Sequence, residues 1–296
     1  MGKSLAAASA AARAVFAEAE EALGYSVSKL CWEGSEDQLR LTEYTQPALL
    51  TVSVAAMASL REGGIPEPHY VAGHSLGEYS ALVAAGALRF ADAARVVRNR
   101  GRYMQEAVPA GEGAMAALLR LPEGRLEAVL AEAGQGQVVS AANLNSPDQV
   151  VIAGHAAAVA RAIELAKAAG AKRAVLLPVS APFHCTLMEP ARRRLAADLA
   201  ELPFADPKVT VVNNFAAMEV RTAEEARQGL IDQVPNPVRW TDSIRKLTSL
   251  GVTRFVEVGP GAVLSGLLRG LAPEAESYKF GDWADWGKLA RLRNQA

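Results

Sequence analysis

Residues 73–77 read Gly-His-Ser-Leu-Gly, which has the Gly-x-Ser-x-Gly form of a nucleophile elbow. In an elbow, a serine lies on a sharp turn between a strand and a helix, with its hydroxyl exposed to substrate. The flanking residues predict a short strand at 69–73 and a helix at 78–87. We therefore predict that Ser75 is a nucleophile and that the helix start and the Leu76 amide stabilise an oxyanion beside it.

A serine hydroxyl needs a base to become a nucleophile, and the sequence contains four histidines. His69 lies at the predicted strand start, His74 is beside the serine on the opposite side of the turn, and His155 begins a predicted helix. His184 lies in the irregular segment Ser-Ala-Pro-Phe-His-Cys-Thr at 180–186, where a loop could bring its ring to the serine. We predict that His184 is the base, and the alternative is a histidine on a surface loop.

No histidine follows His184, which argues against the chain order serine, acid, late histidine of most α/β-hydrolases. A serine–histidine pair without an acid needs an acceptor for the second ring nitrogen. A backbone carbonyl or a side-chain amide such as that of Gln233 could supply it. A hydrolase remains an open alternative at this point.

Four arginines, Arg95, Arg98, Arg100 and Arg102, lie in the predicted helix at 92–108, which follows the elbow helix. An arginine near a nucleophile binds a substrate carboxylate through two parallel N–H groups, because its planar fork matches the two oxygens. From the sequence alone, Arg100 is a candidate ligand, but none of the four arginines stands out from the others. The alternative is that all four side chains are solvated on the helix surface.

The order of predicted elements indicates an α/β fold. Residues 111–180 have the pattern β-α-β-β-α-β, which is typical of a ferredoxin-like subdomain. We expect this subdomain to be inserted into a larger hydrolase-like domain with a mostly parallel sheet, formed by residues 1–110 and 181–296. The active site is expected between the two domains, since clefts between domains are favoured ligand sites.

Composition excludes several classes of function. The 296 residues carry a formal net charge of −1, so neither nucleic acid nor an anionic membrane is an expected partner. Cys31 and Cys185 cannot form a disulfide framework and have no metal-binding spacing. No apolar run is long enough to cross a bilayer, and residues 1–13 do not form a secretory signal. We expect a cytoplasmic protein without a metal.

The sequence Gly-His-Ser-Leu-Gly-Glu-Tyr-Ser-Ala-Leu at 73–82 resembles the signature of malonyl-CoA:acyl carrier protein transacylases. The resemblance covers about residues 1–271. Further segments agree in order and spacing: Thr-Gln-Pro-Ala at 45–48, Arg-Gly at 100–101, Met-Gln at 104–105, Asn-Ser-Pro at 145–147, Pro-Phe-His at 182–184, Gln233, Asn-Pro-Val at 236–238 and Glu-Val-Gly-Pro-Gly at 257–261.

This resemblance implies a ping-pong S-malonyltransferase that needs no cofactor and serves fatty-acid or polyketide synthesis. Ser75 would be acylated by malonyl-CoA, and the phosphopantetheine thiol of an acyl carrier protein would then take the malonyl group. By the same resemblance His184 is the base, Arg100 pairs with the malonyl carboxylate, and the main-chain carbonyl of Gln233 orients the histidine.

One departure from the family pattern concerns the start of the sequence. Family members open with a strand and a Gly-Gln-Gly-Ser-Gln loop, whose glutamine amide is a second oxyanion donor beside Leu76. The sequence here starts at residues that resemble the segment after that loop. Either the sequence as given starts too late, or the chain is a truncated member with unpaired sheet edges and slower turnover. Two alternatives remain open, a serine thioesterase or esterase and a truncated module that only docks a carrier protein.

Overall fold

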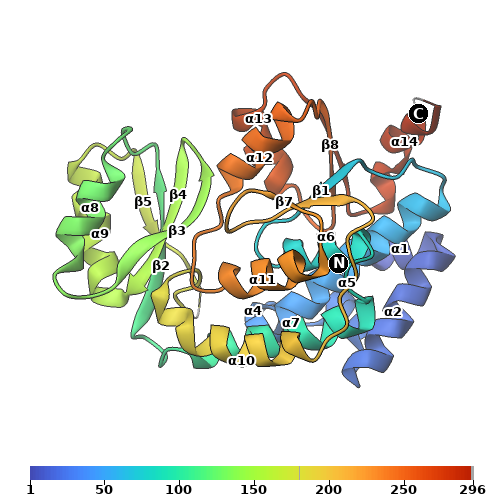
Figure 1. Ribbon diagram of the computed structural model, residues 1–296, viewed down its shortest axis with the longest axis horizontal. Helices are drawn as coiled ribbons and strands as arrows, with labels where there is room; N and C mark the ends of the chain where they lie inside the picture. Colours follow the sequence, from blue (N-terminus) through green and yellow to red (C-terminus); the bar gives the residue numbers. More distant parts are fainter. Residues whose placement is uncertain (180, 295–296) are drawn as a thin grey trace.

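Helices and strands alternate along most of the chain in the computed structural model, which describes residues 1–179 and 181–294 (Figure 1). The predicted α/β class is confirmed. Five helices precede the first strand: α1 (Lys3–Ala8), α2 (Ala10–Leu23), α3 (Val27–Glu33), α4 (Glu36–Arg40) and α5 (Thr42–Glu62). Thr45 followed by Pro47 predicts a helix start at Thr45, but helix α5 begins at Thr42, so Pro47 lies inside the helix instead of in its first turn.

The elbow region follows α5. Its elements are β1 (Tyr70–Ala72), α6 (Gly77–Ala84) and α7 (Phe90–Glu106). Helices α2, α5, α6 and α7 pack around one large apolar core, in which Leu50, Leu82 and Met104 are buried. The core therefore fixes the helix behind the elbow and the helix that carries Arg100 against each other.

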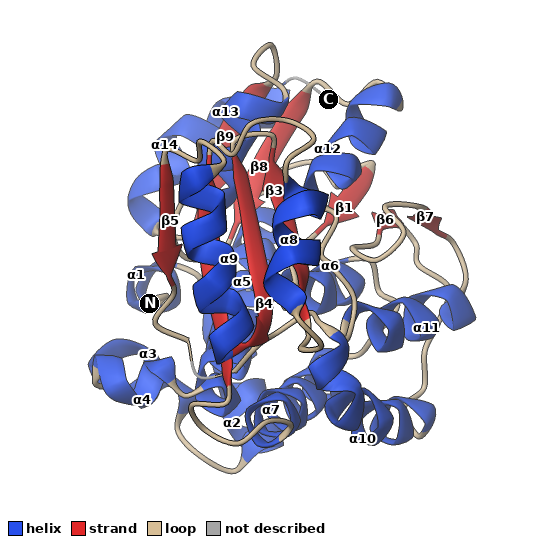
Figure 2. Ribbon diagram, turned by 90° about the vertical axis from the view of Figure 1, so that its left-hand side faces the viewer, coloured by secondary structure: helices blue, strands red, loops and turns tan. Residues whose placement is uncertain are grey.

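The segment 113–176 forms a four-stranded antiparallel sheet of its own, with strand order β3-β4-β2-β5. Its core contains Leu118, Ile152 and Val159 and is separate from the larger core. Its two helices lie side by side over one face of the sheet (Figure 2). The elements are β2 (Gly113–Leu119), α8 (Leu126–Gly134), β3 (Val139–Ser146), β4 (Gln149–His155), α9 (Ala156–Ala168) and β5 (Arg173–Leu176).

The remaining strands form two small sheets instead of the single, mostly parallel sheet that the sequence predicts. The elements are η1 (Thr186–Met188), α10 (Glu189–Ala200), β6 (Thr210–Val212), β7 (Glu219–Val220), α11 (Ala223–Gln233), α12 (Trp240–Ser249), β8 (Arg254–Val258), α13 (Val263–Leu271) and β9 (Glu276–Phe280). Strand β1 pairs in parallel with β6, which pairs antiparallel with β7, and β8 pairs in parallel with β9. No described strand pairs with both β1 and β8, so these two sheets are separate.

The end of the chain is partly regular. Strand β9 extends the sheet beside β8, and short helical segments follow: η2 (Trp283–Asp285), α14 (Trp286–Leu289) and η3 (Ala290–Asn294). Residues 295–296 and Ser180, at which the predicted subdomain boundary falls, lie outside the described residues. Within the described part, no helix combines the length and apolarity needed to cross a bilayer.

Strand β3 connects the four-stranded sheet to the rest of the molecule. The Leu144 amide donates to the Val238 carbonyl at 2.9 Å, and the Val238 amide donates to the Ala142 carbonyl at 2.9 Å. The Thr241 hydroxyl adds a bond to the Leu144 carbonyl at 3.0 Å. The sheet is therefore attached through backbone hydrogen bonds beside the segment that follows α11.

Candidate active site

Ser75 lies between β1 and α6, as the elbow motif predicts, and its φ of 52° is in the left-handed region. A non-glycine residue in that region is strained, and such strain concentrates at functional sites. Gly73 is required, because a Cβ there would lie 1.9 Å from the Gly77 carbonyl oxygen. Gly77 is not required on steric grounds, since a Cβ there would meet nothing within 4 Å. Only the first of the two flanking glycines is thus imposed by the turn.

His184 lies beside the serine. Ser75 Oγ donates to His184 Nε2 at 2.8 Å, and His184 Nδ1 donates to the main-chain carbonyl of Gln233 at 2.9 Å. Because a carbonyl only accepts, this bond fixes the proton on Nδ1 and leaves Nε2 as the acceptor. Burial and the nearby Arg100 cation lower the pKa of His184 to about 3. The ring is therefore neutral at physiological pH and free to take the serine proton.

Arg100 reaches the same hydroxyl from α7. Its guanidinium is 2% exposed and donates to Ser75 Oγ at 3.2 Å, to Gln46 Oε1 at 2.7 Å and to Gln233 Oε1 at 2.9 Å. Its Nε has no partner, and the ion pairs of the described residues do not include Arg100. A buried cation without an anion is costly, so the site favours a ligand that brings a carboxylate.

The other arginines of α7 point elsewhere. Arg95 pairs with Asp92, Arg98 lies over the Tyr25 ring, and Arg102 is exposed beside Tyr103. The sequence left these residues open as carboxylate ligands. Their placement leaves Arg100 as the arginine of this helix that contacts Ser75.

The other three histidines do not contact the Ser75 hydroxyl. His69 is exposed, and His155 ends β4 just before α9 and accepts a hydrogen bond from the Val138 amide. His74 Nε2 bonds to Asn145 Oδ1 at 2.8 Å, on the strand β3 side. His74 thus connects the elbow to the four-stranded sheet instead of acting on the serine.

The amide of Leu76 lies at the start of α6 and makes no hydrogen bond within the described part of the chain. The neighbouring Ser75 amide is already used, because it donates to Asn214 Oδ1 at 2.7 Å. Leu76 therefore offers the free donor of the elbow to a developing oxyanion, and the positive end of α6 adds to it.

Sequence reasoning missed several polar residues around the site, in particular Gln46, Glu78 and Asn214, all of which are buried. The backbone amide of Asn214 donates to the Glu78 carboxylate, and the Asn214 side chain donates to the Gly73 carbonyl in the elbow. Gln46 accepts a hydrogen bond from Arg100. Burial raises the pKa of Glu78 to about 7. Gln46 and Glu78 lie within the family motifs at 45–48 and 73–82, whereas the only signal for Asn214 was the polar pair Asn213-Asn214 after an apolar segment.

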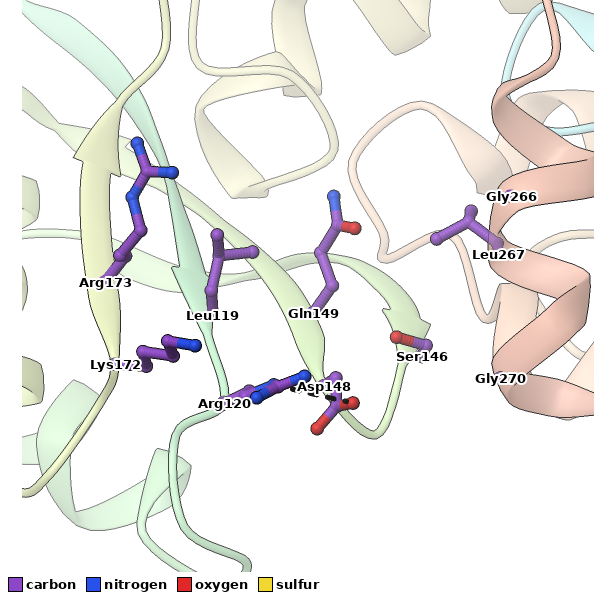
Figure 3. Close-up of a pocket in the computed structure, with 10 residues that line it drawn as sticks. All are labelled: Leu119, Arg120, Ser146, Asp148, Gln149, Lys172, Arg173, Gly266, Leu267 and Gly270. Carbon is purple, nitrogen blue, oxygen red and sulfur yellow. Dashed lines mark ion pairs between the residues drawn. The ribbon is translucent and has the colours of Figure 1, made fainter.

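A cavity of about 460 Å³ lies between α13 and the open end of the four-stranded sheet, which is the end where β2 and β3 finish and β4 and β5 begin (Figure 3). Arg120, Lys172 and Arg173 line the sheet side. Arg120 pairs with Asp148, whereas Lys172 and Arg173 make no ion pair within the described residues. One of its lining residues, Ser146, directly follows Asn145, the partner of His74. Among the described residues, no cluster of His, Cys, Asp or Glu is placed to hold a metal ion.

Comparisons with known proteins agree with this geometry. The model of the acyl transferase domain family matches residues 1–279. The malonyl CoA-acyl carrier protein transacylase of Escherichia coli (strain K12) is 52% identical over 254 residues, which is 86% of this chain and 82% of that protein.

Two solved structures extend the similarity over nearly the whole chain. The structure of the Coxiella burnetii malonyl CoA-acyl carrier protein transacylase has a TM-score of 0.96 at 43% identity and covers 99% of this chain and 93% of that one. A malonyl-transacylase solved in complex with its type II polyketide synthase acyl carrier protein has a TM-score of 0.96 at 44% identity and covers 100% of this chain and 95% of that one.

Proposed function

Since the chain belongs to the acyl transferase family, we propose that it transfers a malonyl group from malonyl-CoA to the phosphopantetheine thiol of an acyl carrier protein. The relatives described above are named as malonyl transacylases, and the structure of one of them was solved in complex with its acyl carrier protein. The observation that carries the proposal is the buried, unpaired Arg100 guanidinium 3.2 Å from the Ser75 hydroxyl. A carboxylate bound to this guanidinium would lie directly beside the Ser75 hydroxyl, which supports the proposal.

In the first half-reaction, Ser75 Oγ attacks the thioester carbonyl while its proton moves to His184 Nε2. The oxygen of the tetrahedral intermediate accepts a hydrogen bond from the Leu76 amide. When the intermediate collapses, the carbon–sulfur bond breaks and the CoA sulfur takes the proton from His184. The product is malonyl-Ser75 and free CoA.

In the second half-reaction, the carrier thiol gives its proton to His184 Nε2 and its sulfur attacks the seryl ester. The carbon–oxygen bond to Ser75 breaks, and Ser75 Oγ recovers the proton from His184. The Gln233 carbonyl supports both halves, because it accepts from Nδ1 and stabilises the imidazolium that forms briefly in each.

Arg100 selects the acyl group. The malonyl carboxylate replaces the missing anion in the buried site, and the planar guanidinium binds both of its oxygens. Gln46 and Gln233 hold the guanidinium from two sides, so little side-chain freedom is lost when the carboxylate binds. An acetyl group offers no such partner.

The two alternatives are less well supported. A thioesterase would use the same elbow but has no need for a buried cation beside the serine, and a docking module has no need for a strained serine paired with a histidine. The Escherichia coli relative is named as a transacylase and not as a hydrolase.

The cavity beside the site suits the phosphate groups of both substrates. CoA and the carrier's prosthetic group each bear phosphates at the far end of a pantetheine arm. Lys172 and Arg173 line the cavity in which such anions would bind, and neither makes an ion pair within the described residues. We further propose that residues 111–180 act as an inserted ferredoxin-like subdomain, on the basis of their separate core and strand order.

A cytoplasmic location is proposed because both cysteines are free, buried thiols.

One labelling experiment tests the proposed function. The protein is incubated with radiolabelled malonyl-CoA, isolated, and then mixed with carrier protein. We expect label on the protein and its transfer to the carrier, and Ser75→Ala should retain none. Rapid release of label to water would indicate a hydrolase, and absence of label from the wild-type chain would contradict the transferase.

A further inference from the structure

Asn214, in the loop after β6, spans the turn that carries the nucleophile. Its Oδ1 accepts from the Ser75 amide at 2.7 Å, and its Nδ2 donates to the Gly73 carbonyl at 2.7 Å. The side chain is fully buried. One planar amide therefore binds the backbone on both sides of His74, in the manner of a strand neighbour, at the point where the pairing of β1 with β6 ends.

This clamp acts where the backbone is strained. The left-handed φ of Ser75 is unfavourable for a residue with a Cβ, so surrounding contacts must hold it. The two short hydrogen bonds fix the peptides that flank the turn and thereby the direction of the Ser75 side chain. They also occupy the Ser75 amide, which leaves the Leu76 amide as the oxyanion donor of the elbow.

The same residue is connected to the base. The backbone amide of Asn214 donates to Glu78 Oε2 at 3.0 Å, and Gln233 Nε2 donates to the same oxygen at 2.7 Å. Gln233 Nε2 also lies 3.0 Å from the Ser75 carbonyl, and the Gln233 carbonyl holds His184. The supports of Ser75 and of His184 are thus parts of one buried network.

We propose that Asn214 is a positioning residue that sets the Ser75 hydroxyl against His184 Nε2 through its clamp on the elbow, with Glu78 fixing the loop of Asn214. The residue touches no reacting atom and acts through the backbone of the nucleophile. The inference rests on the proposed function, since it concerns how the seryl ester forms.

The test uses three variants of the full chain. Asn214→Ala removes both hydrogen bonds. Asn214→Asp keeps the shape and the acceptor for Ser75, but its ionised carboxylate cannot donate to Gly73, whereas its protonated form can. Ser243→Ala is the control, because it removes a buried hydroxyl that bonds to the Asn213 and Arg239 carbonyls without contacting the elbow.

Two rates are measured for each variant: the burst rate constant of acylation by malonyl-CoA, and the rate of labelling of Ser75 by a fluorophosphonate. The burst amplitude counts folded sites, so partial unfolding lowers the amplitude and not the rate constant. The fluorophosphonate reacts with an activated serine whatever the natural substrate is. A failure of the proposed transferase therefore affects only the first rate and is distinguished from a failure of this inference.

We expect Asn214→Ala to lower both rate constants by about 10- to 100-fold, because small displacements of a nucleophile have effects of this size. For Asn214→Asp, the rates relative to wild type should rise as the pH is lowered from about 8 to about 6, since burial raises the pKa of such a carboxyl. The relative rates of Asn214→Ala and Ser243→Ala should not change with pH. Wild-type rate constants in Asn214→Ala, or no acid recovery in Asn214→Asp, would overturn the proposal.

Discussion

Arg100 and Glu78 are two buried ionisable residues in one site, yet neither forms an ion pair with the other in the described structure. Glu78 is instead bound by the Asn214 amide and Gln233 Nε2, while Arg100 is bound by neutral oxygens. Burial disfavours the charged form of both. Their different roles follow from this arrangement, because Arg100 remains available to a substrate anion and Glu78 supports the elbow.

The first prediction at this scale concerns the acyl group. Arg100→Ala should lower the ratio of kcat/KM for malonyl-CoA to that for acetyl-CoA, because the malonyl carboxylate loses its partner at a cost of about 2 to 5 kcal/mol, whereas acetyl loses nothing comparable. Arg100→Lys should restore the ratio only in part, since an ammonium lacks the planar fork. Arg102→Ala, at an exposed position of the same helix, serves as the control. An unchanged ratio in Arg100→Ala would refute the assignment.

The second prediction concerns pH and stability. Burial raises the pKa of Glu78 from 4.5 to about 7 in the folded protein. The folded state therefore holds this proton while the unfolded state releases it, so the contribution to stability is fully present below pH 4.5 and is lost as the pH rises through about 7. The loss amounts to about 3 kcal/mol at most.

Glu78→Gln removes that contribution. The Tm of the variant should consequently fall less than that of the wild type between about pH 5 and about pH 7, as measured by calorimetry. Other groups titrate in the same range, but they contribute equally to both proteins. The difference in Tm between the wild type and the variant therefore isolates the contribution of Glu78. Parallel Tm curves would show that Glu78 does not change its protonation in this window.

At the scale of elements, the elbow depends on the close approach of the end of β1 to the first turn of α6. Gly73→Ala places a methyl group 1.9 Å from the Gly77 carbonyl oxygen, so the strand and the helix must separate. We expect a loss of stability of about 1 to 3 kcal/mol together with the loss of Ser75 acylation.

Gly77→Ala is the matched control four residues away. Its Cβ meets nothing within 4 Å, and alanine favours a helix over glycine by up to about 1 kcal/mol. The control should therefore keep or raise the Tm and retain acylation. Equal effects of the two substitutions on Tm and on labelling would contradict the steric argument.

At the scale of the whole molecule, the site lies where the four-stranded sheet meets the rest of the chain. Hydrogen bonds from β3 to the segment after α11, together with the His74–Asn145 bond, hold the two parts at the active site. The cavity at the open end of the sheet then separates the sheet from α13 (Figure 3). On the proposed function, the acyl group of a substrate with a long arm would lie at Ser75 and its phosphates at Lys172 and Arg173.

The prediction at this scale uses the double substitution Lys172→Glu and Arg173→Glu. KM for malonyl-CoA should rise by about 10-fold or more, because hydrogen bonds to charged groups contribute roughly 1.5 to 3 kcal/mol. The KM for malonyl-N-acetylcysteamine should not change, because this thioester has no phosphate. The double substitution Lys3→Glu and Lys29→Glu, at exposed lysines on α1 and α3, is the control for net charge. Equal increases for both thioesters would place the phosphates elsewhere.

The sequence by itself determined the features that depend on neighbouring residues. The Gly-His-Ser-Leu-Gly elbow, the helix after it and the β-α-β-β-α-β order are local patterns, since each arises from the steric and hydrophobic preferences of adjacent side chains. The family motifs then indicated the function, because they recur in a fixed order along the chain.

Only the tertiary structure decided which residues meet. Ser75 contacts His184 and Asn214, which lie 109 and 139 residues away, and no local preference encodes those pairs. The family resemblance already indicated Arg100 and the main-chain carbonyl of Gln233, and the structure added that the Gln233 side chain accepts a hydrogen bond from Arg100. The physical reason is that burial and hydrogen bonding belong to the packed core, in which residues distant in sequence become neighbours.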